Sequence, residues 1–197
     1  MLQFNALETI LTFFFQDVQE LTAIQSSLRF LPAPISGALS NIVIGFIVHR
    51  VRANWLVTGG VLISAIGPLV MVFATPTSNY WTDAFLANCF NPVGADSLFT
   101  IANLLITSVF PPKTQGLAGG VFNTVSQVGK SVGLALVAVI AASVTRSSEF
   151  SDKQSPRALL QGYRATFWFC FALILTTFIV SAWGLRRVGT VGHKKRE

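Results

Sequence analysis

The sequence predicts an all-α membrane protein: a polytopic helical bundle with five complete transmembrane spans and a partial one before them. The chain of 197 residues is 52% hydrophobic and only 11% charged, with a mean hydropathy of +0.60, whereas a soluble domain has about 25% charged residues. Several long stretches, of which 53–82 is the longest, contain no Asp, Glu, Lys or Arg. A helix needs ~20 mostly apolar residues to cross a bilayer, so these stretches are long enough to do so.

Hydrophobic runs and the polar residues between them set the predicted elements. The first run, FNALETILTFFF, is too short for a full span, so 1–15 is predicted to be part of a transmembrane helix. A polar stretch follows, and the complete spans are then predicted at 28–48, 55–74, 80–110, 116–144 and 163–185. The connections are short, except for a solvated loop at 145–161, and 186–197 forms a basic tail.

The distribution of Lys and Arg predicts the orientation of these spans. With the tail in the cytoplasm, the cytoplasmic connections have a net charge of +7 and the outer connections a net charge of 0, as the positive-inside bias requires. The cytoplasmic basic residues are Arg50, Arg52, Lys113, Arg186, Arg187, Lys194, Lys195 and Arg196. No partner nucleic acid is predicted from the net charge of +6, because no Lys/Arg stripe alternates with stacking aromatic residues.

Two predicted spans have a charged residue near their middle, Asp96 in one and Lys130 in the other. A charge at the bilayer centre costs about 2.5–3.5 kcal/mol on insertion scales, so it normally faces a bundle interior or a watery cavity. Each charge belongs to a polar stripe with helical spacing. The stripes are Asp96, Thr100, Asn103 and Thr107 on one helix, and Asn123, Gln127 and Lys130 on the other.

Two interpretations of these stripes stay open. In the first, they line a path for a substrate or an ion, and Asp96 is a candidate proton carrier. In the second, Asp96 and Lys130 lie at similar depth on antiparallel helices and form a buried ion pair that only holds the helices together. We favour the path, because ionisable groups inside a membrane are a functional-site hypothesis by default.

Glycine and proline predict where helices pack or bend. The motifs Gly116-x-x-x-Gly120 and Gly129-x-x-x-Gly133 are expected to let a neighbouring helix approach closely. Gly67-Pro68 and Asn91-Pro92 lie within predicted spans, where a proline interrupts one backbone hydrogen bond. Each proline marks either a simple kink or the border of a binding site.

No enzyme and no metal site are predicted. The chain has no HExxH, GxSxG or Walker motif. His49 and His193 lie in basic cytoplasmic connections, where a solvated side chain is expected. Cys89 and Cys170 lie in apolar segments, where small core residues are favoured over a disulfide or metal pair, because no metal-ligand spacing surrounds them.

Three segments resemble the C-terminal half of major facilitator superfamily transporters from fungi: FFFQDVQELTAIQSSLRFLP, GADSLFTIANLLITSVFPPKTQGLAGGVFNTVSQVGKSVGLAL and LLQGYRATFWF. The chain looks most like the fourteen-helix drug:proton antiporters. This resemblance implies two pseudo-symmetric halves that rock around a central site for a small-molecule substrate. It also implies export of a drug, toxin or secondary metabolite, driven by a proton gradient without a cofactor, in the plasma membrane rather than the vacuole.

A loop motif of the superfamily has the pattern Gly-x-x-x-Asp-Arg-x-Gly-Arg-Arg. Gly45 and Arg50 match it in GFIVHRVRANWL, while His49 stands where Asp is usual and Arg52 where Gly is usual. Because of these departures from the pattern, the resemblance does not assign a gating role to this loop.

Complete members of this family are much longer, and alternating access needs two halves around one site. We therefore expect a fragment of an efflux transporter that does not transport alone, and whose path needs an N-terminal half. Two alternatives remain. The chain is a half-transporter that forms a homodimer through its glycine faces, or a membrane protein that transports nothing and only binds a partner.

Overall fold

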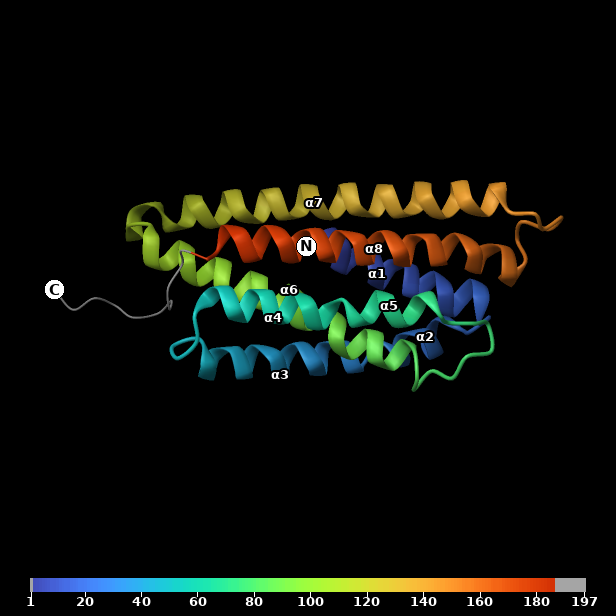
Figure 1. The fold of residues 1–197 in the computed structure, drawn as a ribbon, viewed down its shortest axis with the longest axis horizontal. Coiled ribbons are helices and arrows are strands. Elements are labelled where there is room, and N and C mark those ends of the chain that lie inside the picture. Colours follow the sequence, from blue (N-terminus) through green and yellow to red (C-terminus); the bar gives the residue numbers. More distant parts are fainter. Residues whose placement is uncertain (1, 187–197) are drawn as a thin grey trace.

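The computed structural model describes residues 2–186, and every regular element in this range is helical (Figure 1). The elements in chain order are α1 (Leu2–Phe13), η1 (Phe14–Val18), α2 (Ala23–Arg29), α3 (Pro32–Ile47), α4 (Ala53–Ser64), α5 (Ile66–Val72), α6 (Ala84–Val109), α7 (Pro112–Ser147) and α8 (Pro156–Gly184). The all-α prediction is confirmed. Apart from Arg186, the predicted basic tail lies outside the described residues.

Five helical segments in the described range are long and apolar enough to cross a membrane, which confirms the predicted number. They are α2 with α3, α4 with α5, and then α6, α7 and α8 singly. Because α7 has 36 residues, it is about 54 Å long and exceeds the ~30 Å hydrocarbon core. It continues to Ser147 and α8 begins at Pro156, so the loop between them is shorter than the predicted 145–161.

The N-terminal segment is helical for longer than its apolar run. After α1, the π-helix η1 continues to Val18 and buries Phe14 and Phe15 against the rest of the bundle. A new helix then starts at a capping box, in which the Thr22 hydroxyl accepts from the Gln25 N–H and the Gln25 side chain accepts from the Thr22 N–H.

The two internal prolines have different effects. Upstream of Gly67-Pro68, the helix is interrupted at Ala65, which separates α4 from α5. Since Pro68 has no N–H, it cannot bond to the carbonyl of Ser64 four residues earlier. In contrast, α6 continues through Pro92. The Ser64 hydroxyl lies 3.1 Å from the carbonyls of Phe90 and Asn91, and so it provides a donor close to the proline.

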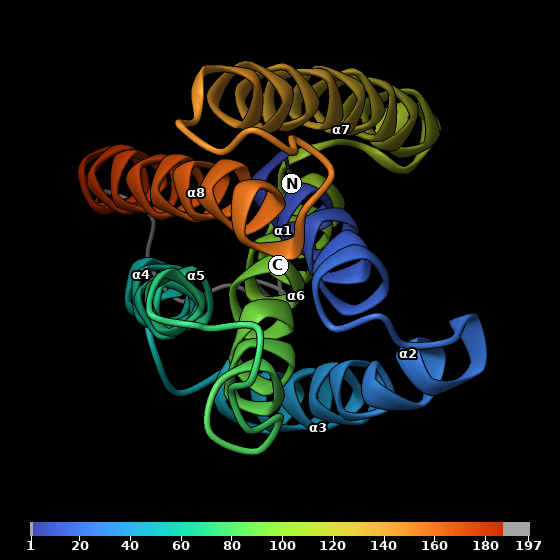
Figure 2. The same cartoon turned by 90° about the vertical axis from the view of Figure 1, so that its right-hand side faces the viewer.

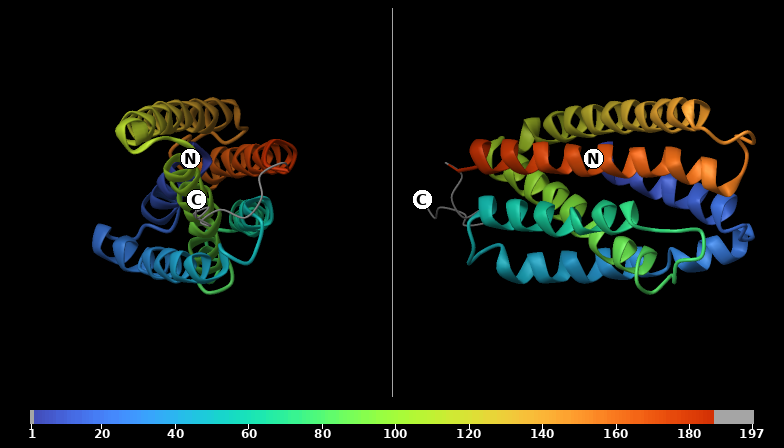
Figure 3. Two further views of the ribbon diagram at one scale, coloured as in Figure 1. Left: turned by 90° about the vertical axis from the view of Figure 1, so that its left-hand side faces the viewer. Right: turned by 45° about the vertical axis from the view of Figure 1, so that its right-hand side comes forward.

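Seen along the bundle, α7 and α8 form one side and α3 forms the opposite side (Figures 2 and 3). The long helix α6 crosses between them and packs against α3, α4 and α5, while α1 packs against α7 and α8. This arrangement leaves one face of α7 without a neighbouring helix from the described chain, because Leu117, Val125 and Val139 are all more than 60% exposed.

Two apolar clusters hold the bundle together. The larger joins α1 and η1 to α5, α7 and α8, and has Phe14, Phe15 and Phe167 fully buried at its centre. The smaller joins α4, α6 and α8 through residues such as Val61, Ile101 and Ile174. The two cysteines are free; Cys170 is buried in the larger cluster and Cys89 is half-buried.

Candidate functional site

A polar groove of about 400 Å³ lies between α1, α3 and α6. Its lining includes Glu8 from α1, Ala33, Pro34, Gly37 and Asn41 from α3, and Asp96 from α6. A neighbouring hollow of about 410 Å³ shares Glu8, Ala33 and Pro34 and continues to Phe30. The groove therefore contains two carboxyl groups that come from different helices.

The carboxyl group of Asp96 lies directly against the backbone of α3. A Cβ atom at Gly37 would come within 2.8 Å of the Asp96 Oδ2 atom, so a larger residue there would displace the Asp96 carboxyl group. One turn later on α3, Asn41 is a hydrogen-bond partner of Asp96. The Asn41 Oδ1 atom accepts from the Thr100 hydroxyl at 2.9 Å, and its Nδ2 atom donates to the Gly37 carbonyl at 3.1 Å. The predicted neighbours Asp96 and Thr100 are thus joined through a residue of α3.

Lys130, on α7, does not line the groove or the neighbouring hollow, but it lies close enough to Glu8 for an electrostatic interaction. The Glu8 carboxylate interacts electrostatically with both Lys130 and Asp96, so the three charges share one region although they come from α1, α6 and α7. Among the described residues, Lys130 forms no ion pair within 4.0 Å with Asp96 or with Glu8. The helix-holding ion pair of Asp96 and Lys130 therefore does not form in this structure.

The other predicted polar residues remain available for contacts. Asn103 is half-buried on α6, whereas Asn123 and Gln127 are exposed on α7. Near them, the rings of Phe99 on α6 and Phe122 on α7 pack with their centroids 5.6 Å apart. The two polar stripes thus lie on helices that contact each other through an aromatic pair.

Two residues of the groove, Glu8 and Asn41, are absent from the sequence predictions. Glu8 is the only charged residue of α1, and this carboxylate in an apolar helix is the signal that would identify it. Asn41 is a single amide in a helix without a polar stripe, and only the packing of α3 against α6 brings it to Asp96. Sequence periodicity contains no such information.

The loop-motif residues lie beyond the groove along α3. Gly45 is exposed, and no neighbouring side chain or helix of the described chain lies within 4 Å of the position that a Cβ atom would take there. His49 and Arg50 are exposed in the turn between α3 and α4. None of these three residues lines the groove.

The predicted glycine contacts on α7 need a correction. Within the described chain, no neighbouring side chain or helix lies within 4 Å of the Cβ position at Gly116, Gly120 or Gly129; Gly133 is buried. The prediction of close packing is therefore wrong for these three glycines in this chain, because the helix arrangement leaves their side of α7 open. Close approaches occur instead at Gly60, Gly94 and Gly162, where a Cβ atom would collide with a neighbouring helix.

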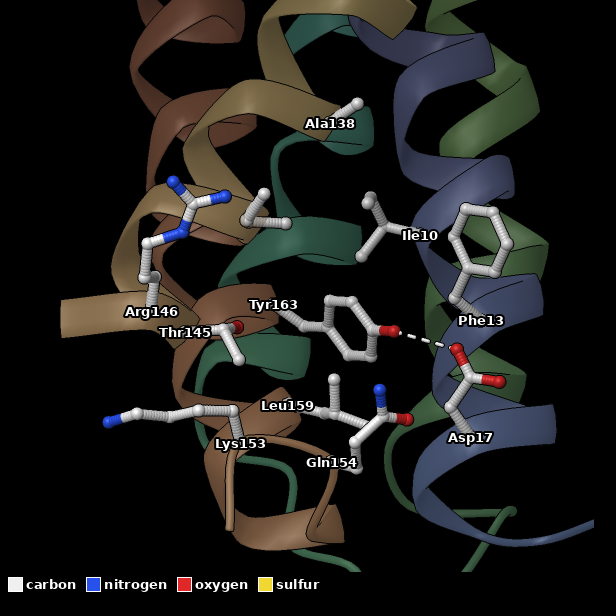
Figure 4. Close-up of a pocket in the computed structure, with 12 residues that line it drawn as sticks. Ile10, Phe13, Asp17, Ala138, Thr145, Arg146, Lys153, Gln154, Leu159 and Tyr163 are labelled. Carbon is white, nitrogen blue, oxygen red and sulfur yellow. Dashed lines mark hydrogen bonds between the residues drawn. The ribbon is translucent and has the colours of Figure 1, made fainter. Parts of the chain in front are cut away.

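A second pocket, of about 490 Å³, lies between α1, α7 and α8 (Figure 4). Its walls are mainly apolar, and across it the Tyr163 hydroxyl donates to the Asp17 carboxylate at 2.8 Å. The cationic side chains of Arg146 and Lys153 lie on the side opposite Asp17 (Figure 4). The pocket lies near the connection between α7 and α8, apart from the groove that contains Asp96.

The fold and the groove together define an integral, multi-pass membrane protein with charged and polar residues inside its helical bundle. Residues 1–134 match the family model of the Major Facilitator Superfamily. The chain belongs to this superfamily, whose members are transporters.

Curated relatives agree with this assignment. The chain is 40% identical to "MFS-type transporter 1" of Pyricularia oryzae over 96% of its own length and 34% of the relative. It is 26% identical to the "Low affinity ammonium transporter" of Saccharomyces cerevisiae, over 79% of the chain and 28% of the relative. It is also 26% identical to "Efflux pump terG" of Aspergillus terreus, over 77% of the chain and 28% of the relative. The chain thus spans about a third or less of the length of these relatives.

Proposed function

We propose that this chain provides one side of a proton-coupled path that exports a small molecule across a membrane. The observation that carries the proposal is that Glu8 and Asp96 line one groove from two helices, with Lys130 on a third helix near Glu8 and no ion pair among these three described residues. A charge inside a bilayer costs about 2.5–3.5 kcal/mol on insertion scales. Charged residues within membrane segments therefore usually face a cavity and take part in function.

In this proposal, Asp96 binds and releases the coupling proton. Its carboxyl group has a neutral hydrogen-bond partner, Asn41, and a second carboxyl group, Glu8, in the same groove. Two carboxyl groups that share a site favour a state in which one of them holds a proton. Asp96 is proposed as the proton-binding member of the two because it lies in a complete membrane-crossing helix, between α3 and the polar groups of its own stripe.

The uncharged residues suggest how a substrate is held. Amide and hydroxyl groups of Thr100, Asn103, Asn123 and Gln127 offer both donors and acceptors. The Phe99 and Phe122 pair adds an apolar surface beside them. We propose an amphipathic organic compound as the substrate, and export as the direction; the likeness to a protein named as an efflux pump supports export.

The path needs a second side. Transporters with repeated halves bind substrate between those halves, and the relatives are about three times as long as the matched region. The open face of α7 and the exposed Glu8 provide a surface on which further helices would complete the cavity. We therefore propose that the active transporter contains an N-terminal half that pairs with the helices described here.

The test is proton-driven efflux from cells that produce this chain together with the unmatched part of the 40%-identical relative. Glu8→Gln, Asp96→Asn and Lys130→Gln are each compared with the unsubstituted chain at several external pH values. We expect Asp96→Asn to abolish the dependence of efflux on pH. Unchanged pH-dependent efflux by this variant would exclude Asp96 as the proton carrier.

Matched controls separate chemistry from folding. Glu20→Gln and Asp152→Asn make the same chemical changes at exposed positions in connections between helices, and both are expected to leave efflux unchanged. The amount of each variant in the membrane is measured in parallel, so that loss of protein is not mistaken for loss of function. If the controls lose efflux as strongly as Asp96→Asn does, the groove is not the path.

The open glycine face of α7 supports a second candidate, a homodimer of two such chains. At Gly116, Gly120 and Gly129, no other helix of the described chain lies within 4 Å of the Cβ position, and small residues are typical of contacts between membrane helices. A Gly120→Cys variant, in a chain without its native cysteines, should form a crosslinked dimer in membranes if two copies meet there. A strictly monomeric product at every protein concentration would remove the homodimer.

We also propose that the C-terminal tail is cytoplasmic and that the protein resides in the plasma membrane. The charge bias of the connections supports this orientation, because basic residues favour the cytoplasmic side. An epitope fused after Glu197 should then be protected from antibody in intact cells and accessible after permeabilisation. Labelling of intact cells would contradict the cytoplasmic tail. An epitope found at the vacuole would contradict residence in the plasma membrane.

A further inference from the structure

A third hollow, of about 780 Å³, lies where the connection after α7 meets the first turns of α8. Ser147, Ser148, Glu149 and Phe150 line one side, and Arg157 and Arg164 line the other. This hollow belongs to neither the Asp96 groove nor the pocket of Figure 4, since it shares no lining residue with them. It lies at the end of the bundle where α7 and α8 are joined (Figure 1).

The arginines of this hollow have no anionic partner in the described part of the chain. No carboxylate lies within 4.0 Å of Arg157 or Arg164. One Nη atom of Arg164 donates to the carbonyl of Ala74 at 2.8 Å, while its buried Nε atom has no hydrogen-bond partner. A partly buried cation without a counter-charge is costly, so an anion that enters the hollow would gain an interaction that the chain does not provide.

Other polar groups of the hollow do not compete for that role. The hydroxyl groups of Ser147 and Ser148 already donate to the carbonyls of Ser143 and Thr145. The remaining charged group is Glu149, which is exposed and has no ion pair among the described residues. The hollow therefore offers two cations and one anion to a ligand, beside the apolar ring of Phe150.

The length of α8 places the hollow at the level of lipid headgroups. With 29 residues, the helix is about 44 Å long, whereas the hydrocarbon core is ~30 Å thick. If α8 is centred in the bilayer, its first turns, which include Arg157, extend into the headgroup region. Arg164 lies two turns further in, where a long cationic side chain reaches back towards the interface. The exposed Trp168, one turn beyond, is a residue type enriched at this boundary.

We propose that this hollow binds the headgroup of a zwitterionic phospholipid. The phosphate lies against Arg157 and Arg164, because guanidinium groups bind phosphate through paired, charge-assisted hydrogen bonds. The ammonium group of the same headgroup lies against the Glu149 carboxylate. An acidic phospholipid without a cationic group also binds the arginines, but it leaves the Glu149 carboxylate next to a second anion. The hollow therefore binds a zwitterionic headgroup more tightly than an acidic one.

The test measures lipid binding to the purified full chain by native mass spectrometry, with phosphatidylethanolamine, phosphatidylcholine and phosphatidylglycerol of identical acyl chains. We expect the two zwitterionic lipids to bind more tightly than phosphatidylglycerol. Arg157→Gln should weaken their binding roughly tenfold, the effect of losing one charge-assisted hydrogen bond. Glu149→Gln should weaken the zwitterionic lipids and not phosphatidylglycerol, so that the selectivity is lost.

Matched variants at the same end of the bundle serve as controls. Arg146→Gln removes an exposed arginine that lines the pocket of Figure 4, and Glu20→Gln removes an exposed glutamate; neither should change lipid selectivity. Arg164 is not substituted, because its bond to Ala74 also joins α8 to the end of α5. Equal binding of all three lipids, stronger binding of phosphatidylglycerol, or equal effects of Arg146→Gln and Arg157→Gln would overturn the proposal.

Discussion

The polar residues on the two faces of α6 have different surroundings. One face, with Gly94, Ser97 and Ile101, is buried against α4. The other face, with Asp96 and Thr100, borders the groove with α3 and remains partly exposed. On the buried face the polar groups are small and bond to nearby backbone, whereas on the groove face a charge stands without an ion pair among the described residues.

The hydrogen bonds on the buried face show why it is a packing surface. The Ser64 hydroxyl of α4 accepts from the Gly94 N–H at 2.7 Å and lies 3.1 Å from the carbonyls of Phe90 and Asn91. The polar groups there thus join the helices α4 and α6. On the groove face, Asp96 and Thr100 interact with Asn41 of α3, but Asp96 forms no ion pair within the described chain. The two faces therefore differ in charge and exposure rather than in the presence of polar groups.

The largest expected effect is a steric one on the packed face. In Gly94→Leu, the new Cβ atom would lie 2.9 Å from the Gly60 carbonyl oxygen, a backbone atom that cannot move away easily. We expect a loss of about 3 kcal/mol in the free energy of unfolding, the upper range for overpacking. Thermal unfolding of the purified variant in detergent measures this loss.

Gly129→Leu on α7 is the matched control, because its Cβ position is open. Its stability should change by less than about 0.5 kcal/mol. Equal losses in the two glycine variants would show that α7 is packed after all, and the contrast between the helices would fail.

A smaller effect is expected from the hydroxyl that joins α4 to α6. Ser64→Ala removes the acceptor of the Gly94 N–H and the donor that lies near two carbonyls of α6. The expected cost is about 1 kcal/mol, measured by unfolding in detergent. Ser131→Ala on α7 removes only a bond to the Gln127 carbonyl of its own helix and should be nearly neutral.

The smallest effect concerns the charges of the groove. A double-mutant cycle of Glu8→Gln and Lys130→Gln should give a coupling energy of about 0.5 kcal/mol, typical of charges that interact without a close ion pair. The cycle of Asp96→Asn and Lys130→Gln should give none that can be measured. If Asp96→Asn or Lys130→Gln alone lowered the free energy of unfolding by about 3–5 kcal/mol, as breaking a buried ion pair does, a structural role for Asp96 and Lys130 would be favoured instead.

The sequence predicts what depends on composition and local geometry. The five membrane-crossing segments follow from their apolar length, and the interruption between α4 and α5 follows from Gly67-Pro68. The polar stripe that includes Asp96 and Thr100 follows from helical spacing, and both residues reach Asn41.

What the sequence does not predict depends on which helices become neighbours. Gly60 and Gly94 contact another helix, whereas Gly116, Gly120 and Gly129 of α7 do not. These residues are identical in the sequence, so only the tertiary arrangement distinguishes them. Likewise, Glu8 and Asn41 belong to different helices, and they line the same groove because α1 and α3 pack around α6. Periodicity within one helix cannot reveal such a meeting.

Thiol accessibility on α6 tests the central claim, that one face of this helix borders a water-filled path, most directly. In a chain with Cys89→Ser and Cys170→Ala, produced with the unmatched part of the relative, the neighbours Thr100 and Ile101 are changed singly to cysteine. Thr100 lies on the groove side, whereas Ile101 is 1% exposed and packed among apolar residues. We predict that a membrane-impermeant thiol reagent labels Thr100→Cys rapidly and leaves Ile101→Cys unlabelled. Equal labelling of the two positions, or labelling of neither, would contradict a path along this face.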